Sequence, residues 1–251
     1  MPTALKSDLS EFYDERFYSD QMDSSYESAR IVLAHVWKFL KAGSVADIGC
    51  GRGTWLKACH ELGSQVLLGY DGSWNDKSKM IDSAIEFNCI DLNQPFSLPK
   101  RVDMAISLEV AEHLEPSSAV QFVECLTNAS DAVLFSAAIT GQGGTNHINE
   151  RPHSYWANIF LEKGYAPFDV IRPVFWEDDR VCFWYRQNIF LYLKKGSAPY
   201  RKLIAEGMPE LTNIGFMNCI HPDLHRSKLT CKSHLKDLIP SFSRALKSRI
   251  G

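Results

Sequence analysis

A glycine-rich turn directly after a short apolar segment restricts the fold of this chain more than any other feature. Residues 44–53 read SVADIGCGRG, in which Gly49, Gly51 and Gly53 alternate with other residues. Glycine is needed where the backbone turns sharply and where a ligand approaches the main chain without interference from a Cβ atom. The next residues, TWLKACHELG, have helical spacing and end at a glycine that suits a helix C-terminus. This strand–turn–helix pattern is typical of α/β proteins that bind a ligand at the turn.

Strand-like and helix-like segments alternate after this turn. Strands are predicted in QVLLGYDGS, near residues 87–92, in VDMAISLEV and in DAVLFSAAI, and the helical segment SSAVQFVECL separates the last two. The aromatic run at 173–195 should close the domain with one or two further strands. This alternation predicts an α/β protein whose parallel sheet is covered by helices on both faces.

Composition and charge restrict the class of protein. With 45% apolar and 12% aromatic residues, the chain can build a sizeable core and is not intrinsically disordered. No apolar stretch approaches the roughly 18 residues of a transmembrane helix, and the polar, acidic first 20 residues do not resemble a signal peptide. Seven cysteines without a CxxC pair favour reduced thiols, and we therefore expect a cytoplasmic protein.

The charge divides the chain unevenly. The whole chain has a net charge of −3, residues 197–251 carry +5, and residues 1–196 therefore carry −8. We predict a helical segment at 1–40, an α/β domain at 41–196 and a basic extension at 197–251. The extension from Lys232 onward has apolar residues at helical spacing between basic ones. Such a helix can pack on its own domain, contact a membrane surface or a partner, or join two copies of the chain in a homodimer.

Acidic residues stand at the ends of three successive predicted strands. Asp47 directly precedes the glycine turn, and Asp71 ends the second strand, eighteen residues after Gly53. An acid in the latter position can accept hydrogen bonds from two ribose hydroxyls. Asp91, followed by Leu92, ends the third strand and is well placed to accept a hydrogen bond from an adenine amino group.

Together, the glycine turn and these acids resemble the first three ligand motifs of the class I S-adenosylmethionine (SAM)-dependent methyltransferases. The resemblance covers roughly residues 26–196 and implies a Rossmann-like fold with a mostly parallel seven-stranded sheet and a catalytic domain at 41–196. It also implies a methionine moiety near Asp47 and Gly49, ribose on Asp71 and adenine near Asp91. The residues expected to bind the cofactor are Asp47, Gly49, Gly51, Gly53, Asp71, Asp91, Leu92 and Ser107.

The segment after the fourth strand, SLEVAEHL, carries candidate catalytic residues. If a helix begins near Glu109, then Glu109, Glu112 and His113 share one helical face, where they can hold a divalent cation. This spacing resembles that of the small-RNA 2′-O-methyltransferases and the ubiquinone-pathway O-methyltransferases, which add a later histidine. His147 lies in the equivalent region, and His153 is a second candidate.

Three interpretations of this cluster remain open. Glu109, Glu112, His113 and His147 can bind Mg²⁺, Mn²⁺ or Fe²⁺, which would lower the pKa of a substrate hydroxyl. Without a cation, a histidine can act as a general base and the glutamates can favour the N-terminus of a helix. The cluster can also be purely structural. In the first two cases His113, His147 and Glu109 are the expected catalytic residues.

The leading hypothesis is an O-methyltransferase of a small polar substrate, such as a sugar, a nucleotide-linked sugar or a natural-product hydroxyl. The loop at 141–153, which begins GQGG and continues with polar and aromatic residues, suits a segment that orders over a substrate. RNA 2′-O-methylation is an alternative, but the net charge of −8 in residues 1–196 disfavours nucleic acid. A non-catalytic, cofactor-binding partner subunit is a further alternative.

Overall fold

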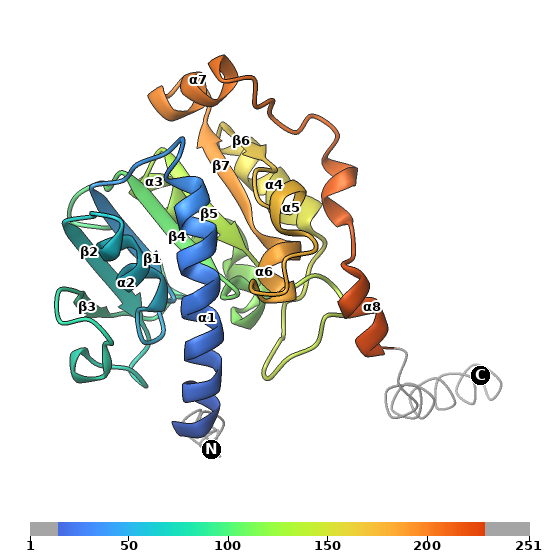
Figure 1. Ribbon diagram of the computed structural model, residues 1–251. Helices are drawn as coiled ribbons and strands as arrows, with labels where there is room; N and C mark the ends of the chain where they lie inside the picture. Colours follow the sequence, from blue (N-terminus) through green and yellow to red (C-terminus); the bar gives the residue numbers. More distant parts are fainter. Residues whose placement is uncertain (1–14, 229–251) are drawn as a thin grey trace, which may run out of the picture. The chain divides into compact units, whose positions relative to one another are not determined.

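The structure is a computed structural model that describes residues 15–228, and it divides into one unit that ends at Asn218 and another that begins at Cys219. Within the first unit, a seven-stranded sheet has the order β3-β2-β1-β4-β5-β7-β6 (Figure 1). Strand β7 is antiparallel to both of its neighbours, and the other pairs are parallel. The strands are β1 (Ser44–Ile48), β2 (Val66–Asp71), β3 (Glu86–Cys89), β4 (Met104–Leu108), β5 (Ala132–Ser136), β6 (Tyr165–Phe168) and β7 (Phe190–Lys194).

Every residue of the central strands β4 and β5 is buried. Their nearly continuous apolar sequences are typical of parallel strands with both faces covered. The structure thus confirms the predicted Rossmann-like α/β fold with a mostly parallel seven-stranded sheet. The aromatic run at 173–195 contributes one strand, β7, and most of two short helices before it, α5 (Arg172–Phe175) and α6 (Phe183–Asn188), whereas β6 precedes the run.

Helices cover both faces of the sheet. One apolar core joins the sheet to α1 and α2, and the other joins it to α3 and α4; in Figure 1 α1 crosses the nearer face. The helices of the first unit are α1 (Glu15–Val36), α2 (Thr54–Glu61), α3 (Ala119–Ala129), α4 (His153–Glu162), α5 (Arg172–Phe175), α6 (Phe183–Asn188) and α7 (Ala198–Ala205). The second unit contains α8 (Pro222–Lys228).

The strand order reverses between β1 and β4. From β1 the chain builds outward through β2 to β3, and from β4 it builds in the opposite direction to β5. The crevice at the carboxyl ends of two such strands is where open α/β sheets bind ligands. Both sequence motifs lie at this point, because the glycine turn follows β1 and Glu109–His113 follows β4.

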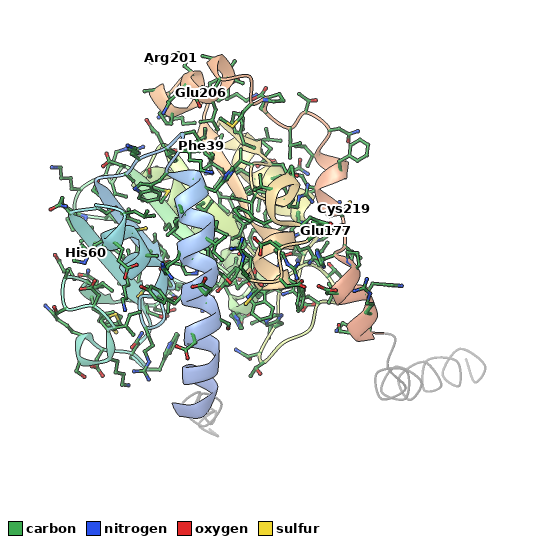
Figure 2. The ribbon with its side chains drawn as sticks, viewed as in Figure 1. Phe39, His60, Glu177, Arg201, Glu206 and Cys219 are labelled. Carbon is green, nitrogen blue, oxygen red and sulfur yellow. The ribbon has the colours of Figure 1, made fainter. Side chains whose placement is uncertain are left out.

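The segment after β7 packs against the sheet domain. Lys202 on α7 donates a hydrogen bond from Nζ to the carbonyl of Phe39 at 2.7 Å, near the end of α1. Figure 2 labels Phe39, and Arg201 on the same helix as Lys202. The Leu211 amide donates to the carbonyl of Pro167 at 2.8 Å and so borders the edge strand β6. Residues 197–218 therefore belong to the same compact unit as the sheet, although the sequence placed a boundary after residue 196.

Two sequence expectations concern membranes and the basic tail. Among residues 15–228, no helix has both the length and the apolar character needed to cross a bilayer. The amphipathic helix expected from Lys232 onward lies outside the described residues.

Candidate active site

The glycine turn after β1 has a backbone that other residues rarely adopt. Gly49, Gly51 and Gly53 all have positive φ angles, of 85°, 53° and 85°. A Cβ atom on Gly49 would also lie 2.3 Å from Cγ2 of Val110, a residue in the segment that follows β4. The turn therefore requires glycine at this position both for its conformation and for its close approach to the neighbouring segment.

Asp71 at the end of β2 is hydrogen-bonded to this turn. Its Oδ2 accepts from the Gly51 amide and its Oδ1 from the Gly72 amide, each at 2.7 Å. Burial raises the pKa of the Asp71 carboxyl, and these hydrogen bonds oppose the rise. Each carboxylate oxygen has a further lone pair, so Asp71 can still accept hydrogen bonds from ribose hydroxyls.

Asp47 is buried beside Asp71. Only 3% of Asp47 is exposed. Burial, together with the charge of Asp71, raises the pKa of Asp47 to about 8. The carboxyl group is therefore mostly protonated at neutral pH. A cationic group opposite it, such as the ammonium of a bound methionine moiety, would favour its ionised form.

The other residues expected to bind the cofactor occupy varied environments. Asp91 is exposed, and its Oδ1 accepts a hydrogen bond from the Asn93 amide at 3.0 Å. Leu92 is buried beside it. Ser107 on β4 is completely buried, and its Oγ has no hydrogen-bond partner among the described residues. The adenine contact of Asp91 and the role of Ser107 stay predictions.

The segment after β4 does not form the expected α-helix. Glu109 has a φ of 55°, and a 3₁₀ helix, η3 (Ala111–His113), follows it. The expectation that Glu109, Glu112 and His113 share one α-helical face is therefore wrong, since the left-handed residue turns the chain before any helix begins.

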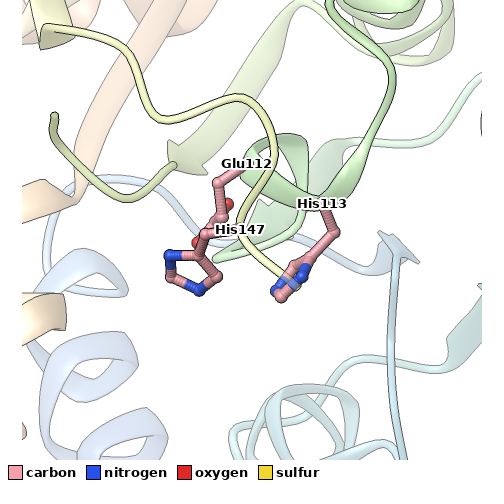
Figure 3. Close-up of side chains that lie close together, drawn as sticks. All are labelled: Glu112, His113 and His147. Atoms are coloured by element: carbon pink, nitrogen blue, oxygen red, sulfur yellow. The ribbon is translucent and has the colours of Figure 1, made fainter. Parts of the chain in front are cut away.

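Glu112, His113 and His147 come together instead (Figure 3). One potential ligand atom from each side chain lies within 4.8 Å of the other two. The imidazole rings of His113 and His147 meet edge to face, with centroids 4.8 Å apart. The structure thus brings together three of the four residues that were predicted from the sequence as metal ligands.

Glu112 is the least satisfied member of this triad. It is completely buried, and neither carboxylate oxygen has a hydrogen-bond partner among the described residues. Burial and the neighbouring charge of Glu109 raise the pKa of Glu112 well above its usual range. An unpartnered buried carboxyl beside two imidazoles fits a divalent cation, because the cation would compensate the cost of burial.

Each histidine of the triad has its Nδ1 occupied. Nδ1 of His113 donates to the carbonyl of Asn146 at 3.2 Å, and Nδ1 of His147 lies 2.9 Å from Oε1 of Glu150. Burial and the adjacent His147 lower the pKa of His113 to about 4. His113 is therefore neutral at pH 7, the state that a metal ligand needs, but it is a weak general base.

Glu109 lies beside Glu112 and accepts hydrogen bonds from two amide side chains. Nδ2 of Asn188 donates to its Oε1 at 3.0 Å, and Nε2 of Gln142 donates to its Oε2 at 3.0 Å. Burial raises the pKa of Glu109 above its usual value. Its predicted roles as a ligand and as a catalytic residue remain predictions, since in this arrangement both oxygens already accept hydrogen bonds.

The second candidate histidine, His153, is buried at the start of α4 outside the triad. Its Nδ1 lies 2.7 Å from the carbonyl of Met217, and its Nε2 lies 2.9 Å from Oδ1 of Asn188. Asn188, Gln142 and Glu150 were not among the site residues predicted from the sequence. The glycines around Gln142 and the cluster of polar residues before Glu150 were usable signals. Asn188 directly follows Arg186 and Gln187, before an apolar strand segment, and gave none.

Comparisons with known proteins agree on the fold. No protein-family model matches this sequence, and no curated protein matches it. Among solved structures, magnesium protoporphyrin IX methyltransferase from Synechocystis PCC 6803 with bound SAH (S-adenosylhomocysteine) is similar with a TM-score of 0.51 and 17% identity, over 73% of this chain and 90% of that one. A chain of the complex between the Haloferax volcanii Trm112 methyltransferase activator and the putative methyltransferase has a TM-score of 0.55 and 13% identity, over 76% and 99%.

A third similar structure is an O-methyltransferase family protein from Burkholderia thailandensis. It has a TM-score of 0.52 and 13% identity, over 79% of this chain and 65% of that one. At these identities the similarity concerns the fold. The chain has the fold of the class I SAM-dependent methyltransferases, as its glycine turn and strand-end acids predicted.

Proposed function

We propose that this protein is a SAM-dependent O-methyltransferase that acts on a hydroxyl group of a small polar substrate. The observation that carries the proposal is the pairing of the Gly51 amide with Asp71 at the point where the strand order reverses. A glycine turn after β1, joined to an acid after β2, can hold both the amino-acid and the ribose parts of SAM. The triad of Glu112, His113 and His147 lies beyond β4, the other strand at this point.

The residues of the chain have distinct tasks in this proposal. Asp47 faces the ammonium group, Asp71 accepts hydrogen bonds from the ribose, and the triad holds the acceptor hydroxyl. When bound, SAM would supply a methyl group on a sulfonium. The substrate oxygen would attack the methyl carbon in line, the C–S bond would break with SAH as the leaving group, and the hydroxyl proton would be lost to a base. Holding both reactants in this alignment removes much of the entropic cost of the reaction.

The triad supports cation assistance better than a histidine base alone. Its donor set of one carboxylate and two imidazoles suits Mn²⁺ or Fe²⁺, with Mg²⁺ accepting nitrogen ligands less readily. A divalent cation held there lowers the pKa of a bound hydroxyl. His113 is too weakly basic to serve as the principal base, and in the cation-free alternative that task belongs to His147.

Binding of SAH to Asp71 variants tests the proposal. Asp71→Ala removes a charged hydrogen-bond acceptor. We expect the binding free energy of SAH, measured by titration calorimetry, to become less favourable by about 1–3 kcal/mol. Asp103→Ala is the matched control. Asp103 also accepts hydrogen bonds from two backbone amides, those of Gly43 and Ser44, but next to the opposite end of β1.

The control separates ligand binding from loss of stability. Asp103→Ala should lower the thermal stability and leave the affinity for SAH unchanged. Unchanged affinity in Asp71→Ala, or no binding of SAH to the unmodified protein, would refute the proposed cofactor site.

A further inference from the structure

The carboxylate of Glu150 organises the loop that carries His147. Its Oε2 accepts a hydrogen bond from the Gly141 amide at 2.8 Å, and its Oε1 accepts one from the Gly143 amide at 2.5 Å. The same Oε1 lies 2.9 Å from Nδ1 of His147. One side chain thus joins two amides of the glycine-rich segment to the imidazole.

These contacts determine which nitrogen of His147 carries the proton. An ionised carboxylate only accepts hydrogen bonds, so Nδ1 must be the donor in this pair. In the neutral imidazole, Nε2 is then the unprotonated nitrogen with a free lone pair. Cation binding and proton abstraction both need such a lone pair.

The backbone around His147 holds the ring beside the rest of the triad. The amides of Ile148 and Asn149 both donate to the carbonyl of Glu112 at 2.9 Å. A Cβ atom on Gly144 would lie 2.2 Å from Nε2 of His147 and 2.4 Å from Cε1. These similar distances place Gly144 over the face of the ring, so the in-plane lone pair of Nε2 is not covered by this residue.

We propose that Glu150 is a positioning residue that holds His147 in the Nδ1-protonated tautomer and thereby presents Nε2 to Glu112 and His113. The proposal rests on the proposed function for its purpose, but the tautomer itself is a property of the chain alone. Replacement of Glu150 by glutamine tests the proposed role, because the amide keeps the size of the side chain but offers His147 a donor as well as an acceptor.

The tautomer can be measured by ¹⁵N NMR of histidine-labelled full-length protein at a pH where His147 is neutral. His147→Gln identifies the signal. We expect a protonated Nδ1 and an unprotonated Nε2 in the unmodified protein, and a mixture of tautomers in Glu150→Gln. Glu124→Gln is the control, since Glu124 forms an ion pair with Lys163 at 3.0 Å, on helix α3 outside this loop.

Binding of Mn²⁺ alone, followed by electron paramagnetic resonance, adds a second readout. Loss of a carboxylate that orients a ligating histidine typically weakens metal affinity about 10–100-fold, which is the change expected for Glu150→Gln, with unchanged affinity for SAH. A protonated Nε2 in the unmodified protein would overturn the proposal. So would an unchanged tautomer in Glu150→Gln, even if that variant melts at a lower temperature, because Glu150 would then be only structural.

The two readouts also separate this proposal from the proposed function. If the unmodified protein binds neither SAH nor Mn²⁺ but His147 has the expected tautomer, the proposed function fails and the positioning role of Glu150 stands. If the unmodified protein binds both SAH and Mn²⁺ but His147 has the opposite tautomer, the proposed function stands and the positioning role of Glu150 fails.

Discussion

Asp47 occupies the carboxyl end of β1 with only 3% of its surface exposed, next to the carboxyl group of Asp71. Two nearby acids in a buried setting oppose each other's ionisation, and the pKa of Asp47 rises to about 8. Ionisation of such a residue destabilises the ligand-free protein. Its presence is understandable if a cationic ligand group pairs with it.

The raised pKa of Asp47 predicts a pH-dependent cost of folding. The folded protein holds this proton up to about pH 8, whereas the unfolded chain releases it near pH 4, so the contribution of Asp47 to stability decreases as pH rises between these values. Asp47→Asn removes this dependence. We expect the variant to gain stability over the unmodified protein as pH rises from 5 to 8, by up to about 1.4 kcal/mol per pH unit.

Urea unfolding in the absence of SAM at pH 5, 6.5 and 8 measures this difference. Because both proteins share all other titrating groups, their effects largely cancel in the comparison. A difference in stability that is the same at all three pH values would contradict the raised pKa.

Short irregular segments, rather than regular helices, assemble the triad. The 3₁₀ helix η3 supplies Glu112 and His113, and the loop after β5 supplies His147. The loop is attached to η3 by backbone hydrogen bonds from Ile148 and Asn149 to Glu112, so the two segments are held as one assembly. A site on loops that are fixed by such contacts can be both exact in geometry and accessible to substrate.

This assembly predicts a binding site for a divalent cation. We expect the protein to bind Mn²⁺ in paramagnetic resonance titrations, and Glu112→Gln and His147→Gln each to weaken the binding by at least about tenfold. His60→Gln serves as control, because His60 pairs with Asp82 at 2.7 Å at the end of α2. Equal affinity in all four proteins would place the cation elsewhere, and no binding would leave His147 as a general base.

At the scale of the molecule, the chain beyond β7 contributes to the core of the sheet domain. Leu203 on α7 and Met217 in η5 (Ile214–Asn218) are completely buried, one in each of the two apolar cores. The carbonyl of Met217 also accepts a hydrogen bond from Nη1 of Arg172 at 2.8 Å. The +5 charge of residues 197–251 therefore does not mark a separate unit before Asn218.

Truncation of these buried side chains should destabilise the whole domain. We expect Leu203→Ala and Met217→Ala each to lower the free energy of unfolding by about 2–5 kcal/mol, the usual range for a buried aliphatic side chain. Ile204→Ala, at a neighbouring position that is 43% exposed, should cost much less. Chemical denaturation measures all three. Similar small effects at all three positions would show that residues 197–218 are dispensable for the fold.

The sequence predicted more of the glycine-turn side of the candidate site than of the side that follows β4. The Gly49–Gly53 turn and Asp71 follow directly from local patterns, because glycine spacing and strand ends are visible along the chain. The sequence also named Glu112, His113 and His147. The predicted α-helix from Glu109 was wrong, because no local sequence pattern indicates a left-handed φ of 55° at a glutamate.

The sequence by itself determined the strand–helix alternation and hence the edge where the glycine turn, Asp71 and the segment after β4 meet, because parallel strands place their carboxyl ends on one side of a sheet. The tertiary structure alone decided which groups each carboxylate of the site contacts. Asn188, 79 residues from Glu109, donates a hydrogen bond to that carboxylate. Glu150 instead contacts Nδ1 of His147 and accepts hydrogen bonds from two loop amides. Such long-range hydrogen bonds depend on packing between distant segments, which no local periodicity encodes.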